Sequence, residues 1–288
     1  MPPSPLIAVD IGNSRIKFGL FTGRGRDGEL PEPVQTLELS VVAFDTGKLD
    51  VWLAKTMGQV TTPPMWWIAS VNRPPTQRLA AWLQERGATE FGPADPNKRP
   101  TVTPTDTDSA FCRLKHSDLP LIVSLPQPDR VGIDRLLGAV AVNRLRTADR
   151  AAIVIDIGSA ITVDLVSPQG AFLGGAILPG IGMSARAMHE FTDQLPLLAM
   201  DELVEPPPAL GKSTLEAMQS GLYWGAIGAM KELLARLADQ MGQHSGEKSP
   251  PEVYLTGGAA PSIARFVDPR ATFVPHLVLG GIALVAQQ

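Results

Sequence analysis

One stretch constrains the fold of this chain more than any other. Ala151–Val166 reads AAIVIDIGSAITVDLV, which predicts a strand, a tight turn and a second strand. The apolar run Ala151–Ile155 is typical of a strand buried on both faces, and Asp156 ends that run. The turn falls at Ile157-Gly158-Ser159, and β-branched residues continue to Val166. A carboxylate at the end of a buried strand is costly unless a cation or hydrogen bonds compensate it, so this turn is a candidate functional site.

The same pattern opens the chain. Leu6–Leu20 reads LIAVDIGNSRIKFGL, with an apolar strand, Asp10, Gly12, a small hydroxyl at Ser14 and a second strand. Two copies of Asp-Ile-Gly followed by a small polar residue predict a duplicated architecture that serves one shared ligand. A length of 288 residues suggests about two domains. We therefore predict an N-terminal half at 1–130 and a C-terminal half at 131–288.

Composition narrows the classes of protein. The formal net charge is −4 and the sequence pI is about 5.6, which disfavours a nucleic-acid or membrane-surface role. The single cysteine, Cys112, cannot form an internal disulfide and is compatible with a reducing compartment. No apolar run reaches the roughly 18 residues of a membrane span, and the N-terminus has no signal-peptide pattern. We expect a cytoplasmic protein with no membrane partner.

The first half predicts alternating strands and helices after its hairpin. The expected strands are Thr36–Ser40, Met65–Val71 and Pro120–Ser124, the expected helices are Asp50–Met57, Thr76–Arg86 and Val131–Leu145, and Phe91–His116 is expected to be irregular. The paired tryptophans Trp66 and Trp67 favour core packing over a stacking platform for bases, because no basic cluster surrounds them.

The second half predicts a further strand and a long helix. After the strand Ala171–Leu178, a glycine turn at Pro179–Met183 precedes a helix at Ser184–Phe191. Ser213–Met241 is predicted as a long helix, with Ser213 and Glu216 in capping-box register. This helix carries Gly221, Gly225 and Gly228, each costing about 1 kcal/mol relative to alanine, which indicates close approach to another helix or to a ligand. The expected remaining elements are a strand at Glu252–Thr256 and helices starting at Pro261 and Pro275.

Two motifs resemble nucleotide-binding signatures but fail on context. Gly211-Lys212-Ser213 ends like a phosphate-binding P-loop, but position 206 is proline where that motif needs glycine. Gly180, Gly182 and Ala185 match a dinucleotide fingerprint, but they lie in the C-terminal half and not near a first strand. The histidines at 116, 189, 244 and 276 are scattered without metal-ligand spacing, so structural roles are favoured for them.

A third segment carries chemistry. Gly132-Ile133-Asp134-Arg135 begins a predicted helix. Asp134 is explained either as a favourable partner of the helix dipole or as a general base beside a guanidinium that holds an anion. Glycine turns offer N–H groups to phosphate oxygens, and strand-end carboxylates suit a cation. Together these parts indicate phosphoryl transfer, in which positioning and charge neutralisation supply most of the catalysis.

The sequence resembles the type III pantothenate kinases, which belong to the acetate kinase, sugar kinase, heat-shock chaperone and actin superfamily. The motifs that carry the resemblance are DIGNSRIK at Asp10–Lys17, GIDR at Gly132–Arg135, DIGSAITVD at Asp156–Asp164, the segment Pro179–Pro196, the glycine-bearing helix from Gly211, and YLTGGAA at Tyr254–Ala260. The resemblance implies transfer of the ATP γ-phosphate to the primary hydroxyl of pantothenate, the first step of coenzyme A synthesis. It implies an α/β fold of two ribonuclease H-like (actin-like) halves with the active site in the cleft between them, in a homodimer.

The resemblance also implies roles for individual residues. The ATP-binding residues would be Asp10, Ile11, Gly12, Asn13, Ser14, Arg15, Ile16, Lys17 and Ser159. The pantothenate-binding residues would be Gly132, Ile133, Asp134, Arg135 and Thr192, with Asp134 as the proton acceptor. Asp156 would bind a monovalent cation, K⁺ or NH₄⁺, and Mg²⁺ would accompany ATP.

The chain departs from the family pattern at a few positions. Ser14 and Ser159 stand where threonine is usual, and both keep the hydroxyl. Leu125 stands where the family has a tyrosine in the substrate pocket, and Gly138 lies near the position of a frequent asparagine. Two alternatives stay open: a non-catalytic regulator resembling the Bvg accessory factor, and a superfamily kinase for another small alcohol or sugar. The presence of Asp134-Arg135 and Asp156 favours an enzyme, whereas Leu125 favours a different acceptor.

Overall fold

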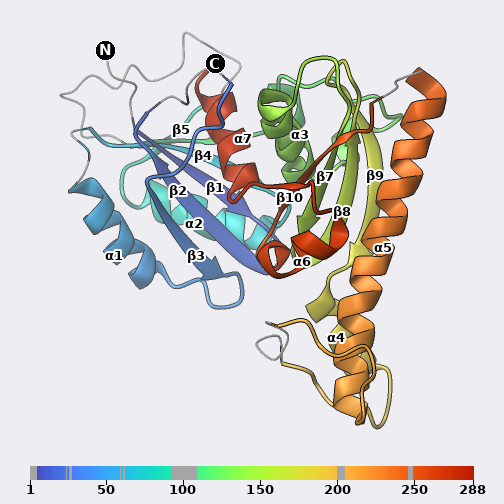
Figure 1. Cartoon of the computed structure of the whole chain (residues 1–288). Helices are drawn as coiled ribbons and strands as arrows, with labels where there is room; N and C mark the ends of the chain where they lie inside the picture. Colours follow the sequence, from blue (N-terminus) through green and yellow to red (C-terminus); the bar gives the residue numbers. More distant parts are fainter. Residues whose placement is uncertain are drawn as a thin grey trace. The chain divides into compact units, whose positions relative to one another are not determined.

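A computed structural model describes residues 5–23, 25, 28–58, 60, 62–92, 109–199, 205–245 and 249–288. The chain forms two compact units (Figure 1). Unit 1 comprises Met1–Ile122, Pro126–Leu145 and His276–Gln288, and unit 2 comprises Val123–Leu125 and Arg146–Pro275.

Unit 1 is built on a six-stranded sheet of order β3-β2-β1-β4-β6-β5. The strands are β1 (Leu6–Ile11), β2 (Arg15–Phe21), β3 (Gln35–Ser40), β4 (Met65–Ser70), β5 (Thr89–Glu90) and β6 (Ala110–Arg113). The first three form an antiparallel meander, and β4, β6 and β5 run parallel to β1. The predicted hairpin and the predicted third and fourth strands are confirmed. Every residue of β1 is buried, as its unbroken apolar run predicts.

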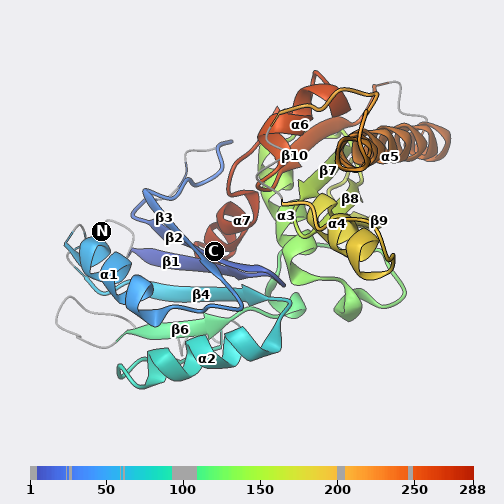
Figure 2. The same ribbon diagram turned by 90° about the horizontal axis from the view of Figure 1, so that it is seen from below.

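Helices cover both faces of this sheet (Figure 2). They are α1 (Thr46–Met57), α2 (Arg73–Gln84), α3 (Ile133–Leu145) and α7 (Leu277–Ala286). Trp52 of α1 and Trp82 of α2 join the core on one face, where Trp66 is 1% exposed and packs edge-on against the Trp82 ring. Helix α7 covers β1 on the other face, and α3 packs against α7. The core role predicted for both adjacent tryptophans is confirmed, since Trp67 is 2% exposed.

Several element boundaries in unit 1 differ from the predictions. Helix α1 begins four residues earlier than predicted because the Asp45 side chain accepts a hydrogen bond from the Lys48 N–H and caps the helix. Helix α2 also begins earlier, since two prolines suit a first helical turn. The irregular structure predicted for Phe91–His116 is wrong at β6, a four-residue strand that pairs with β4, and residues 93–108 lie outside the described part. The strand predicted at Pro120–Ser124 is reduced to one bridge between Val123 and Phe172.

Unit 2 repeats the plan of unit 1. Its strands are β7 (Ala152–Ile157), β8 (Ala160–Val166), β9 (Phe172–Pro179), β10 (Glu252–Thr256) and β11 (Thr272–Phe273), in the order β11-β10-β7-β8-β9. Here too the first three strands form an antiparallel meander, and β10 and β11 run parallel to the first of them, β7. Asp10 and Asp156 are each the fifth residue of that first strand. The predicted duplication is therefore present in the strand order and in the placement of the two aspartates.

The two halves do not divide at residue 130 in the contact pattern. Helix α3, predicted to open the C-terminal half, belongs with the sheet of unit 1, and so does the last helix, α7. Helix α7 has the sequence LVLGGIALVA and is buried almost throughout. A helix that is apolar all round must be covered on several sides, and β1 and α3 together provide that cover.

Three helices belong to unit 2: α4 (Ile181–Glu190), α5 (Thr214–Ser245) and α6 (Ala260–Val267). Helix α4 begins within the segment predicted as a glycine turn. The capping of α5 is confirmed on one side, because Ser213 Oγ accepts from the Glu216 N–H at 3.2 Å. Tyr223, Ile227 and Met230 of α5 are buried in the core of unit 2. None of the helices in the described residues has the length and apolar character needed to cross a membrane.

The three α5 glycines lie on an open face. A Cβ atom built on Gly221, Gly225 or Gly228 would meet nothing within 4 Å. The sequence predicts close approach of another helix or of a ligand, and no helix in the described part of this chain makes that approach.

The connection from α3 to β7 is fixed by one partly buried carboxylate, that of Glu252. Glu252 accepts hydrogen bonds from the Thr147 hydroxyl at 2.6 Å, from Arg150 at 3.1 Å and from the Tyr254 hydroxyl at 2.9 Å. Burial by itself raises the pKa of Glu252, but the bonds from Thr147 and Tyr254 and the charge of Arg150 outweigh it and lower the pKa below its ordinary value of 4.5. Burial, together with the hydrogen bond to Glu252, raises the pKa of Tyr254 far above its ordinary range.

Candidate functional site

The first candidate loop is the turn between β1 and β2. Asp10 lies opposite Lys17 in the strand register, and its Oδ2 atom is 4.0 Å from Lys17 Nζ. The Gly12 N–H donates to the Arg15 carbonyl at 3.0 Å and closes the turn, and Arg15 pairs with Glu38 on β3. A buried strand end therefore presents a glycine turn beside a lysine, which suits a bound phosphate.

The β1–β2 turn is held by the connection between β4 and α2. The Val71 N–H donates to the Ile11 carbonyl at 3.0 Å, and the Asn72 side-chain amide donates to the Gly12 carbonyl at 3.4 Å. Neither Val71 nor Asn72 was predicted to belong to the site. The signal in the sequence is an asparagine two residues before a Pro-Pro pair, in Asn72-Arg73-Pro74-Pro75.

The second candidate loop is Gly132–Arg135, which begins α3. Asp134 Oδ1 accepts a hydrogen bond from the Arg135 N–H at 2.9 Å, so the carboxylate lies back against its own first turn. A Cβ atom on Gly132 would lie 2.4 Å from that oxygen and 3.6 Å from Val71 Cγ1. Only glycine leaves room for the carboxylate in this place. His116 Nε2 donates to the Val131 carbonyl at 2.6 Å and holds the residue before the turn.

These parts of unit 1 gather at one edge of its sheet. Strands β1, β4 and β6 are parallel, so their carboxyl ends meet at the same edge. Gly12 follows β1, Val71 follows β4, and His116 follows β6 and contacts Val131, just before α3. Ligands of open α/β sheets bind outside the carboxyl ends of the strands. The structure thus brings the predicted residues Asp10–Lys17 and Gly132–Arg135 into one neighbourhood.

His276 adds a titratable group beside Lys17. It precedes α7 and has a left-handed backbone with φ of 57°. Burial lowers the pKa of His276 below its ordinary value of 6.5, and the charge of Lys17 lowers the pKa further, against the opposing charges of Glu38 and Glu32. Both effects disfavour the positively charged form of this imidazole beside Lys17.

In unit 2, Asp156 is the last residue but one of β7 and lies beside closely packed backbone atoms. Gly257 follows β10 with φ of +99°, and a Cβ atom there would lie 2.6 Å from Asp156 Oδ1 and 2.5 Å from the Ile157 carbonyl oxygen. Carboxylate and carbonyl oxygens are the ligands of hard cations, so this donor set fits an alkali ion. Ser159 lies in the adjoining turn, where its carbonyl accepts from the Gly180 N–H at 3.1 Å.

Thr192 lies apart from this turn. Its hydroxyl donates to the Met188 carbonyl at 2.6 Å and closes the end of α4. Helix α4 has 10 residues, and Gly180, at its other end, contacts Ser159. At about 1.5 Å per residue, Thr192 is on the order of 15 Å from Ser159 along the helix. Within unit 2 the structure does not bring Thr192 to the other predicted residues.

Leu125 packs in unit 2 at the edge of the sheet. Its Cδ2 atom is 3.3 Å from the place where a Cβ atom on Gly174 of β9 would lie. The neighbouring Ser124 N–H donates to the Phe172 carbonyl at 2.9 Å, so the segment is tied to β9. Leu125, which stands where the family has a pocket tyrosine, is therefore half-buried against β9.

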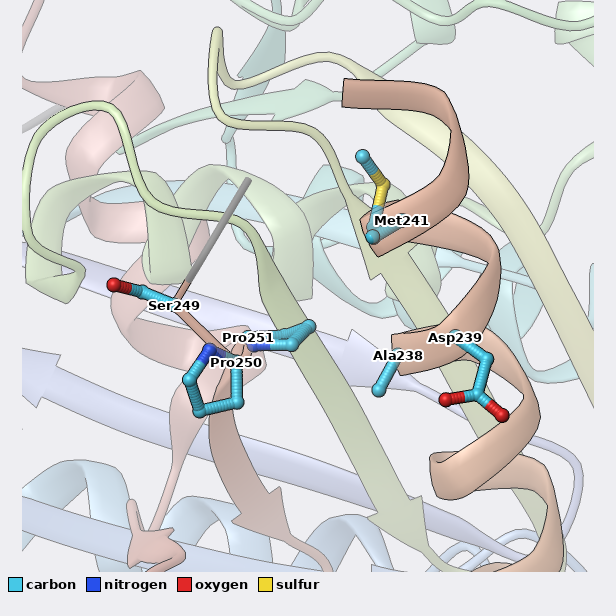
Figure 3. Close-up of a pocket in the computed structure, with 7 residues that line it drawn as sticks. Ala238, Asp239, Met241, Ser249, Pro250 and Pro251 are labelled. Carbon is cyan, nitrogen blue, oxygen red and sulfur yellow. The ribbon is translucent and has the colours of Figure 1, made fainter. Parts of the chain in front are cut away.

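A cavity of about 250 Å³ lies elsewhere in unit 2 (Figure 3). Its lining comes from the end of α5 and from Ser249–Pro251, which precede β10. Asp156 lies at the opposite, carboxyl end of the parallel strands β7 and β10, so this cavity is separate from the candidate site. Among the described residues, no three His, Cys, Asp or Glu side chains gather as a metal site.

Comparison with solved structures defines the class of the fold. A Baf family protein from Campylobacter jejuni covers 98% of this chain and 98% of its own, with a TM-score of 0.55 and 20% identity. The Lmo2764 protein from Listeria monocytogenes, described as an N-acetylmannosamine kinase, covers 98% of this chain and 99% of its own, with a TM-score of 0.50 and 14% identity. The fold is the duplicated actin-like α/β fold that the sequence predicts.

The comparison of sequences names the family. The family model of type III pantothenate kinases matches residues 6–236, and the chain belongs to that family. The type III pantothenate kinase of Rhodospirillum rubrum is 38% identical over 168 residues, which are 58% of this chain and 61% of that protein. That of Gluconobacter oxydans is 34% identical over 188 residues, 62% of this chain and 66% of that protein. The chain thus spans less than two thirds of the length of these relatives.

Proposed function

We propose that this protein transfers the γ-phosphate of ATP to the primary hydroxyl of pantothenate and forms 4'-phosphopantothenate, the first step of coenzyme A biosynthesis. The observation that carries the proposal is the fixed Asp134 carboxylate, seated over Gly132 and joined through Val71 to the Gly12 loop. A carboxylate held next to a phosphate-binding turn is the arrangement that a kinase of small alcohols requires.

In this mechanism Asp134 is the proton acceptor. Its Oδ1 atom accepts from the Arg135 N–H, and its Oδ2 atom takes the hydroxyl proton of pantothenate. The hydroxyl oxygen then forms a bond to the γ-phosphorus as the bond from that phosphorus to the bridging oxygen breaks and ADP leaves. The Arg135 guanidinium holds the carboxylate of pantothenate, since its planar fork matches a carboxylate.

The phosphate charge of ATP would be neutralised by N–H groups, a lysine and cations. In unit 1 the Asn13 and Ser14 N–H groups and the Lys17 ammonium face the ATP phosphates, since the Gly12 N–H already bonds the Arg15 carbonyl. In unit 2, Ser159 contacts ATP, and Asp156 with the Ile157 carbonyl would hold K⁺ or NH₄⁺. When bound, that cation would supply positive charge near the phosphates, and Mg²⁺ would arrive with ATP and bind mainly through its phosphate oxygens.

We further propose a cytoplasmic homodimer with no nucleic-acid partner. The homodimer is supported by the open glycine face of α5. It is also supported by exposed apolar side chains on α4, on the segment after α4 and at the start of α5. These are Met183, Phe191, Leu197, Leu210 and Leu215, on elements that lie together in Figure 1. Such exposed apolar groups are typical of a surface that another protein covers. Sedimentation equilibrium at several protein concentrations tests the dimer, and a monomer at all of them would contradict it.

The test of the activity is an ADP-release assay on purified protein. Pantothenate should stimulate ADP release far above a panel of sugars and glycerol, and mass spectrometry should detect 4'-phosphopantothenate. Leu125 is the observation that favours the second candidate, a kinase for another small alcohol, since it removes a hydroxyl from the expected pocket. Stimulation by a sugar and not by pantothenate would select that candidate. No acceptor-dependent release at all would select the non-catalytic regulator.

A further inference from the structure

Asn72 occupies the N-cap position of α2 but cannot cap that helix. An N-cap side chain normally accepts a hydrogen bond from the N–H of the second or third helical residue. In α2 those two residues are Pro74 and Pro75, which have no N–H. Consistently, the Asn72 side chain makes no capping hydrogen bond. The carboxamide is therefore able to hydrogen-bond to a group outside α2.

That carboxamide reaches the first phosphate loop. Asn72 Nδ2 donates to the Gly12 carbonyl oxygen at 3.4 Å, across a sequence separation of 60 residues. The Asn72 backbone is itself fixed, because its N–H donates to Ser70 Oγ at 2.9 Å and its carbonyl accepts from Thr76 Oγ1 at 2.6 Å. The donor is thus presented from a rigid turn at the end of β4.

We infer that Asn72 is a positioning residue of the phosphate loop, an inference that rests on the proposed use of ATP. The Gly12 carbonyl and the Asn13 N–H belong to one planar, trans peptide unit, so they point in opposite directions. When Asn72 holds the carbonyl, the Asn13 N–H points away from Asn72. The loop is then arranged before the nucleotide arrives, and binding does not have to order this peptide.

The neighbouring Val71 extends the same turn to the acceptor side. Its N–H donates to the Ile11 carbonyl at 3.0 Å, and its Cγ1 atom lies 3.6 Å from the Cβ position of Gly132. The turn Ser70–Asn72 therefore contacts both the phosphate loop and the loop of Asp134. Asn72 acts on the nucleotide side only, so its loss should affect ATP and leave the affinity for the acceptor nearly unchanged.

The test compares Asn72→Ala and Asn72→Asp with the control Gln77→Ala, which removes an exposed carboxamide from the same helix. Calorimetry with a non-hydrolysable MgATP analogue measures Kd, and thermal unfolding measures Tm. We expect Asn72→Ala to raise Kd roughly 3- to 10-fold, as expected for one lost hydrogen bond. We expect Asn72→Asp to raise it further, since a carboxylate repels both the Gly12 carbonyl and the phosphates. Tm should change little, because no cap is lost, and KM for pantothenate should stay within about twofold.

Each outcome decides the inference. An unchanged Kd in both Asn72 variants overturns it, and so does a large fall in Tm with no change in Kd, which would assign Asn72 a purely structural role. If the wild type binds the analogue but does not phosphorylate pantothenate, the proposed function fails and the Kd ratio still decides the role of Asn72. If the wild type binds no nucleotide, both proposals are overturned.

Discussion

Replacing Gly132 by alanine should disable the proposed base while the fold survives. The added Cβ would lie 2.4 Å from Asp134 Oδ1, whereas ordinary contact begins at 3.4 Å. The carboxylate must therefore move by about 1 Å. The backbone of Gly132 is outside the left-handed region, so alanine brings no strain in φ.

The magnitudes separate catalysis from stability. Losing the bond from the Arg135 N–H costs about 0.5–1.5 kcal/mol, and the lower unfolded-state entropy of alanine returns about 0.4–1 kcal/mol. Tm should fall by no more than about 2–4 °C. A misplacement of about 1 Å at a reacting group costs roughly 10²-fold in rate, so kcat should fall by about that factor.

The assay is kcat for pantothenate-dependent ADP release, with Tm measured on the same samples. Asp134→Asn serves as the reference, since asparagine can still accept from the Arg135 N–H but is no base, and its kcat should fall roughly 10²- to 10⁴-fold. Gly132→Ala that keeps most of its kcat would refute the placement of the base. An Asp134→Asn protein with normal kcat and a much lower Tm would show that Asp134 only stabilises the start of α3.

Three further predictions concern other parts of the chain. K⁺ or NH₄⁺ should raise activity well above Na⁺, and Asp156→Asn should blunt that response; equal rates in Na⁺ and K⁺ would contradict the cation site. Leu125→Tyr should lower KM for pantothenate a few-fold to roughly tenfold by restoring a hydrogen bond, and an unchanged or higher KM would contradict the pocket role. The lowered pKa of Glu252 stabilises the fold above about pH 4.5, and this is lost as pH falls through the folded-state pKa. Glu252→Gln should therefore lower Tm at pH 7 and much less in acid, and a pH-independent difference would refute this.

Local sequence was sufficient to predict a structural element where the environment of a residue follows from its neighbours along the chain. The apolar runs before Asp10 and Asp156 predicted two buried strands, and the glycines after them predicted the turns. The repeat of that pattern predicted the duplicated fold, which the strand orders of both sheets confirm. The cap of α5 at Ser213 was also readable, since an N-cap bond spans only a few residues. The roles of the predicted site residues stay predictions.

Tertiary structure decided the features that depend on distant partners. Strand β6 is too short for a periodic signal and exists because β4 pairs with it. Helices α3 and α7 join unit 1 because an apolar helix needs cover from segments far away in sequence. The seat of Asp134 over Gly132 depends on the first turn of α3, and the bond from Asn72 to Gly12 spans 60 residues. A linear pattern reports the polarity of a position, but hydrogen bonds across such separations form only when the folded backbone brings donor and acceptor together.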